Sequence, residues 1–101
     1  MKMIMIVFRE SFEDDIRDLL SQNQVEAFTE MLDVVGKGEA GAAFQSVSWP
    51  GLNNMILVAL PEVQADRVVA ALKKFHDQQV RNERGTKIPM RVFTLPCELV
   101  V

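Results

Sequence analysis

The residues best suited to contact an anion lie in a glycine-rich stretch, G-K-G-E-A-G, from Gly36 to Gly41. Glycines let backbone N–H groups approach an anion closely, and Lys37 adds a positive charge. The stretch lacks the G-K-[ST] ending of a nucleotide-binding P-loop, and no helix is predicted to follow it. The pattern favours a hinge, and a second interpretation of the same residues is a hinge that also binds an anion.

Other candidates for chemistry are few, because the chain has one cysteine and one histidine. Cys97, the adjacent Glu98 and His76 are candidate ligands for a soft metal. The competing interpretations are a small hydrophobe at a strand end for Cys97 and a surface residue for His76. The acids at 13–15 have a structural role as helix-start residues. No nucleophile and base can be paired, so the sequence predicts a protein that is not an enzyme.

The segment W-P-G-L-N-N, from Trp49 to Asn54, is a candidate contact with a protein partner. Exposed tryptophans are frequent in the energetic centres of interfaces. The alternative is a tryptophan that packs on its own or a neighbouring subunit, with Pro50 and Gly51 as a turn. Asn53 and Asn54 are predicted to be turn residues.

Composition limits the classes of protein that this chain can be. Its 101 residues predict a single domain, 1–101. The net charge of −3 argues against a nucleic-acid partner, because phosphate binding needs clustered Lys and Arg. A single cysteine excludes a disulfide within the chain. The opening apolar run is too short for a signal peptide or a membrane span, so we expect a cytoplasmic protein without membrane insertion.

Apolar patterning predicts most of the elements. Three short apolar runs predict strands at 3–8, 55–60 and 88–95. One helix should begin with Ser11 as N-cap and end at 21–23, and another should run from Pro61 to 79–80. Their predicted buried faces are Phe12, Ile16, Leu19 and Leu20, and Val63, Val68, Val69, Leu72 and Phe75. The segment 24–35 has helical apolar spacing, so the pattern alone slightly favours a helix there.

If 24–35 is instead a strand, the order of elements becomes β-α-β-loop-β-α-β. That order is the α+β, ferredoxin-like βαββαβ arrangement, a four-stranded antiparallel sheet with both helices on one face. The central strands are apolar on both faces, so the uncovered face of the sheet predicts self-association.

In this order and spacing the chain resembles the PII signalling superfamily over nearly its whole length. The matching parts are the opening strand, the D-D-I-R at Asp14–Arg17, the strand that ends in G-K-G-E-A-G, the Gly-and-Lys turn at Gly85 and Lys87, and an R-V-F strand. The W-P-G-x-N-N segment is most similar to short-loop PII-like proteins. The resemblance changes the expectation for 24–35 to a long strand.

The resemblance implies a homotrimer that binds a small effector, ATP, ADP, AMP or another small anion, in clefts between subunits. Its implied effector-binding residues are Gly36, Lys37 and Gly38 on one wall and Arg84, Gly85, Thr86 and Lys87 on the other. The loop at 36–54 is implied to contact a target protein, an enzyme or membrane transporter, through Phe44, Trp49, Pro50 and Gly51. Such a protein regulates a pathway, with nitrogen regulation as one candidate.

The chain departs from the nitrogen regulators in two ways. It has no tyrosine, which excludes control by tyrosyl modification of the loop. The basic residues that grip terminal phosphates after the last strand are replaced by Cys97 and Glu98. An alternative resemblance is to trimeric metal-responsive proteins of the divalent-cation-tolerance or metal-efflux type, with Cys97, Glu98 and His76 as ligands.

Overall fold

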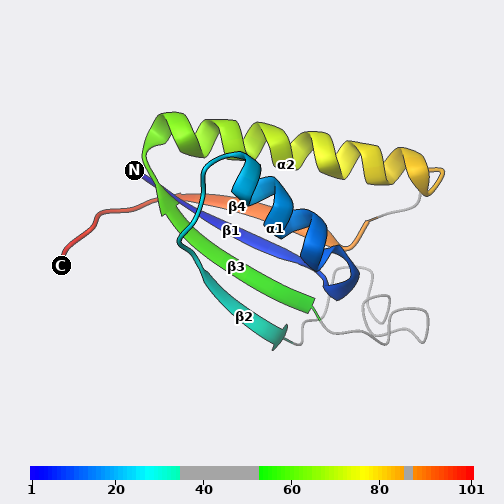
Figure 1. Cartoon of the computed structure of the whole chain (residues 1–101), viewed down its shortest axis with the longest axis horizontal. Coiled ribbons are helices and arrows are strands. Elements are labelled where there is room, and N and C mark those ends of the chain that lie inside the picture. Colours follow the sequence, from blue (N-terminus) through cyan, green and yellow to red (C-terminus); the bar gives the residue numbers. More distant parts are fainter. Residues whose placement is uncertain (35–52, 86–87) are drawn as a thin grey trace.

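The structure is a computed structural model that describes residues 1–34, 53–85 and 88–101. In chain order its elements are β1 (Lys2–Arg9), a 3-10 turn (Glu10–Phe12), α1 (Glu13–Gln22), β2 (Thr29–Val34), β3 (Asn53–Leu60), α2 (Glu62–Asn82) and β4 (Met90–Pro96). The described strands form one sheet in the order β2-β3-β1-β4, and every neighbouring pair is antiparallel. This is the predicted ferredoxin-like arrangement (Figure 1).

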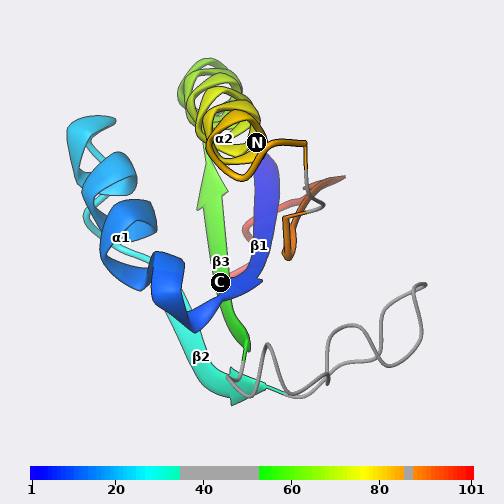
Figure 2. The same cartoon turned by 90° about the vertical axis from the view of Figure 1, so that its right-hand side faces the viewer.

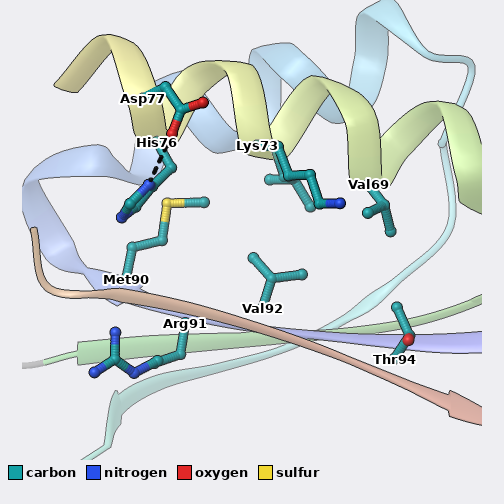
Figure 3. A pocket seen from close by; sticks show the side chains of 9 residues that line it. Val69, Lys73, His76, Asp77, Met90, Arg91, Val92 and Thr94 are labelled. Atoms are coloured by element: carbon teal, nitrogen blue, oxygen red, sulfur yellow. Dashed lines mark hydrogen bonds and ion pairs between the residues drawn. The ribbon is translucent and has the colours of Figure 1, made fainter. Parts of the chain in front are cut away.

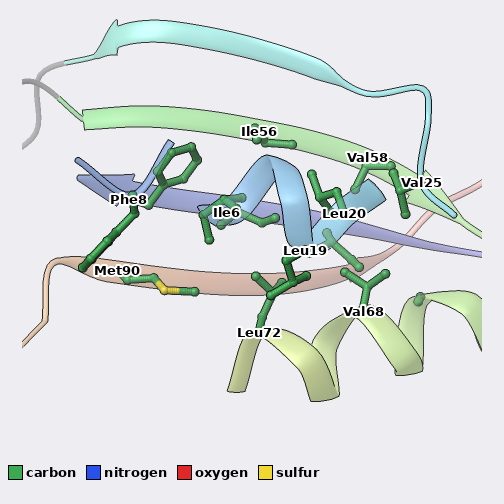
Figure 4. Packing of buried hydrophobic residues seen from close by; sticks show 14 of the residues in the cluster. Ile6, Phe8, Leu19, Leu20, Val25, Ile56, Val58, Val68, Leu72 and Met90 are labelled. Atoms are coloured by element: carbon green, nitrogen blue, oxygen red, sulfur yellow. The ribbon is translucent and has the colours of Figure 1, made fainter. Parts of the chain in front are cut away.

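The two helices lie over the same face of the sheet, where the core forms (Figure 2). Alternate residues of β1 point toward the helices, and Ile4, Ile6 and Phe8 are fully buried there. Side chains from α1, β3 and α2 fill the space between the layers (Figure 4). All four residues of the predicted α1 face, Phe12, Ile16, Leu19 and Leu20, belong to this core, as predicted.

The opposite face of the sheet carries a second apolar surface, which no described helix covers. We call it the open face, and the pairing of the strands brings its members side by side. One row across the sheet runs from Leu57 through Met5 to Phe93, and Phe93 is 51% exposed. The open face consists of Met3, Met5, Val7, Met31, Met55, Leu57, Phe93 and Leu95.

The segment 24–35 is a strand only over Thr29–Val34, so the helix favoured by its apolar spacing is wrong and the strand is shorter than expected. Its apolar residues serve different surfaces, which explains the misleading spacing. Val25 is buried beneath the end of α1, Met31 lies on the open face, and Leu32 is 63% exposed. The strand is interrupted by a bulge between Met31 and Val34.

Several predicted boundaries and caps also change. Ser11 is not the N-cap of α1; it lies in the 3-10 turn and its Oγ accepts a hydrogen bond from Arg9 Nε at 2.8 Å. The helix α2 continues to Asn82, beyond the predicted end. Val63 is 72% exposed, because Ala65, Val68 and Leu72 form the buried stripe. No helix in the ranges that the structure describes is long and apolar enough to cross a membrane.

Candidate functional site

The ends of four elements meet at one end of the sheet. Asn53, which begins β3, pairs with Val34 at the end of β2 and with Arg9 at the end of β1. The Arg9 N–H donates to the Pro89 carbonyl at 3.1 Å, just before β4 begins. The chain therefore enters 35–52, returns from it, and crosses 86–87 at the same end of the sheet. Both walls implied for the effector cleft are attached there.

Arg84 and Gly85 close the end of α2. Both residues are left-handed, with φ of 57° and 82°. The Gly85 N–H donates to the Val80 carbonyl at 2.8 Å, and the Arg84 N–H donates to the Arg81 carbonyl at 3.1 Å. These bonds satisfy the last carbonyls of the helix. They also fix an exposed arginine at the end of the sheet where the cleft is expected.

The remaining predicted effector and contact residues lie outside the described residues. They are Gly36, Lys37, Gly38, Thr86 and Lys87, and, in the contact loop, Phe44, Trp49, Pro50 and Gly51. Their roles stay predictions.

Arg9 is a further positive charge at this end that the sequence analysis did not select as a binding residue. Its Nη2 lies 3.8 Å from Glu83 Oε2, at the C-cap of α2. Its guanidinium also lies 4.8 Å from the centre of the Phe12 ring. Arg9 therefore joins the end of β1 to the end of α2. The sequence signal was an arginine directly after a buried strand.

A polar network joins α1, β2 and β3 beside the same end of the sheet. Arg17 Nε lies 2.5 Å from Glu13 Oε2, and Arg17 Nη2 lies 2.7 Å from Glu30 Oε1. The Asn54 Nδ2 donates to Glu13 Oε1 at 2.7 Å. Asn54 is 3% exposed and lies in β3, so the prediction that it is a turn residue is wrong.

The two carboxyl groups of this network are unlike in their ionisation. The side chain of Glu30 is 7% exposed, and its Oε2 has no hydrogen-bond partner in the described part of the chain. Burial, followed by the neighbouring Glu13, raises the pKa of Glu30. Burial also opposes ionisation of Glu13, but hydrogen bonds with Glu30, Arg17 and Asn54 outweigh it and lower the pKa of Glu13. A proton retained on Glu30 supplies the donor that its buried oxygen otherwise lacks.

A cavity of about 540 Å³ opens beside this network. Glu10, Glu13, Asp14 and Asp33 line it, and Arg17 is the one cation among its described lining residues. This excess of carboxylates disfavours a phosphate or another anion there. The network therefore positions the strands beside the candidate cleft and is a poor effector site itself.

The candidate metal ligands do not converge. His76 lies on α2 beside Met90 at the start of β4, whereas Cys97 follows the end of that strand (Figure 3). His76 Nδ1 has Asp77 Oδ1 as a neighbour at 3.5 Å. Among the residues with described positions, no group of three or more His, Cys, Asp or Glu side chains is arranged to hold a metal ion. The geometry within one subunit gives the metal-responsive alternative no support.

Solved structures share this fold. A nitrogen regulatory PII-like protein of Thiomonas intermedia K12, solved with ADP, AMP and bicarbonate, has a TM-score of 0.66 and 20% identity, and the match covers 92% of this chain and 86% of that one. Its apo form gives 0.66 and 18%, with 93% and 85% covered. A PII-like protein of Thermus thermophilus gives 0.57 and 18%, with 93% and 83% covered. At these identities the likeness establishes the fold.

Sequence comparison supplies the family. No curated protein matches the chain. The family model of the nitrogen regulatory protein P-II matches residues 1–101, the whole of the sequence. Members of this family are generally signalling proteins without enzymatic activity. The order of elements, the shared fold and this full-length match agree, and the chain belongs to the nitrogen regulatory protein P-II family.

Proposed function

We propose that this chain is a single-domain, non-enzymatic regulatory protein that binds a small anionic effector between the subunits of a homotrimer. The observation that carries the proposal is the meeting of both implied cleft walls at one end of the sheet, since Val34, Asn53 and Pro89 all lie beside Arg9. Arg84, Gly85 and the untested Gly36, Lys37, Gly38, Thr86 and Lys87 are the proposed contacts.

An adenine nucleotide is the first candidate effector. The Thiomonas relative was solved with ADP, AMP and bicarbonate, and also with acetate in place of bicarbonate, so it accommodates nucleotides and small anions. In this chain Arg9 and Arg84 are described cations at the corresponding end of the sheet. The loop through Trp49 is proposed to contact the target protein, in a cytoplasmic setting.

The open face is the proposed trimer interface. Its methionine, leucine and phenylalanine side chains form a continuous apolar surface across all the described strands. Apolar patches of this kind mark association surfaces, and a chain of 101 residues gains much from burying one. Sedimentation should give a particle of three times the 11.4 kDa chain mass.

Thermal unfolding with ATP, ADP, AMP, cyclic AMP and bicarbonate tests the effector proposal. A ligand that binds only the folded state raises the midpoint by mass action. The Arg84→Ala variant should lose most of the shift, and Arg67→Ala, an exposed arginine elsewhere on α2, should keep it. No shift with any of these compounds would overturn the proposal.

A further inference from the structure

The outer edge of β4 borders a groove that the described chain leaves unfilled. β4 pairs with β1 along one edge, and no described strand pairs with its other edge. Beside it, between β4 and α2, lies a cavity of about 510 Å³ (Figure 3). Its apolar lining comes from Val69, Leu72, Met90 and Val92. An unpaired strand edge beside an apolar groove accepts an extended peptide, whose backbone pairs with the edge and whose alternate side chains enter the groove.

The segment 97–101 has the complementary properties. It lies outside any described helix or strand, and Leu99 and Val100 are 75% and 80% exposed. Valine and its β-branched relatives favour extended pairing. Five extended residues span roughly 17 Å, and the groove-lining part of β4, Met90–Thr94, has the same number of residues.

This segment does not reach the groove of its own copy. Pro96 still pairs with Lys2, and the Cys97 N–H lies 3.4 Å from the Met1 carbonyl, so the chain stays extended past the end of β4. The groove lies back along the strand, beside Met90 and Val92. Residues 98–101 lead away from the sheet instead (Figure 1). A groove and a matching apolar segment on one chain that do not meet point to exchange between copies.

We propose that residues 97–101 of one copy pair with the free edge of β4 in a second copy and place apolar side chains in the groove between α2 and β4. Charge agrees with this occupant. Lys73 points from α2 toward the strand in Figure 3 and has no ion-pair partner in the described ranges, and Glu98 of the incoming segment supplies the opposite charge. This contact uses the strand edge and the helix side, so it is separate from the proposed open-face interface and from the effector cleft.

Cysteine cross-linking tests the pairing directly, because Cys97 is the only native cysteine. One protein carries Cys97→Ser with Leu99→Cys, and the other carries Cys97→Ser with Lys73→Cys. After mixing and mild oxidation, mass spectrometry should find a disulfide between residues 99 and 73 of different copies. Arg67→Cys, an exposed site of α2 outside the groove, replaces Lys73→Cys in the control. Equal yields for the two sites would overturn the proposal.

Amide hydrogen exchange gives an independent readout. The β4 amides that do not donate to β1 should be protected, and protection should increase with protein concentration. Leu99→Pro with Val100→Pro removes backbone donors and should make these amides exchange about tenfold faster. Val63→Pro would disturb α2, so the matched control is Val63→Ser, an exposed apolar residue outside the groove. Protection that ignores concentration or survives the double proline variant would mean that something else covers the edge. A monomeric Phe93→Lys variant separates this result from the trimer, since the segment contact should persist in it at high concentration.

Discussion

Asn54 and Glu13 are 41 residues apart in sequence, and the Asn54 Nδ2 donates to Glu13 Oε1 at 2.7 Å. The same amide accepts through its Oδ1 from the Asp33 N–H at 3.2 Å. Asp33 has a φ of 59° at the bulge of β2, a conformation that is unfavourable without local support. One buried side chain on β3 therefore fixes α1 and the end of β2 together, beside the candidate cleft.

Replacing Asn54 with Ala should destabilise the protein by about 1–3 kcal/mol, because it leaves Glu13 and the Asp33 N–H without their partner. Urea unfolding followed by circular dichroism measures the change. Asn53→Ala is the matched control, since Asn53 also lies in β3 but makes no side-chain hydrogen bond with a described residue. If the two variants lose equal stability, the Asn54 contacts contribute nothing specific.

The Glu13 and Glu30 pair predicts a distinctive dependence of stability on pH. The folded pKa of Glu30 is raised above its ordinary value of 4.5 by burial and by Glu13. The folded state binds this proton more tightly, so the Glu30 contribution is full below about pH 4.5 and is lost as pH rises through the folded pKa. The shift of Glu13 is downward, and its contribution is lost as pH falls below its ordinary value.

The Glu30→Gln variant keeps a neutral polar side chain and removes the titration. Its unfolding free energy should no longer fall as pH rises from about 4.5 to 8, whereas that of the wild type should. Urea titrations at several pH values measure both slopes. Glu26→Gln, at an exposed position, should behave like the wild type. Parallel curves for the wild type and Glu30→Gln would show that Glu30 is ionised throughout.

Phe93→Lys should disrupt the proposed trimer without unfolding the subunit. Phe93 is 51% exposed in the single copy and sits in the row with Met5 and Leu57, so a lysine there remains solvated in a monomer but is costly in an apolar interface. Sedimentation equilibrium reports the mass. Val63→Lys changes a similarly exposed apolar residue on α2 and should leave the mass unchanged. A Phe93→Lys protein of unaltered mass would place the interface elsewhere.

Arg84 and Gly85 allow backbone strain to be separated from charge. Gly85→Ala meets no atom within 4 Å, so its cost comes from a φ of 82° and should be about 1 kcal/mol. Arg84→Gly should preserve or slightly increase stability, because glycine accepts a φ of 57° without a Cβ penalty. The same Arg84→Gly change should weaken effector binding. Urea midpoints and nucleotide-induced thermal shifts on each variant check the two effects separately, and a variant that loses both together would contradict the separation.

The sequence predicted the core better than it predicted the polar contacts. Ile4, Ile6 and Ile56 lie in short apolar runs whose burial follows from local composition alone. The β2 segment was ambiguous because Val25 and Met31 have helical spacing but are buried on different surfaces. No local signal pairs Asn54 with Glu13, since their contact depends on the packing of α1 against β3. Those long-range contacts are what the folded structure adds at the candidate site.

Calorimetric titration of the purified protein with ADP tests the central claim most directly. The account predicts saturable binding at one site per chain, with three sites per particle, and a marked loss of affinity in Arg84→Ala. Competition by ATP, AMP or bicarbonate at that site would identify the preferred anion. An absence of binding heat for all four compounds at several temperatures, from a protein that sediments as a trimer, would contradict the proposed effector function.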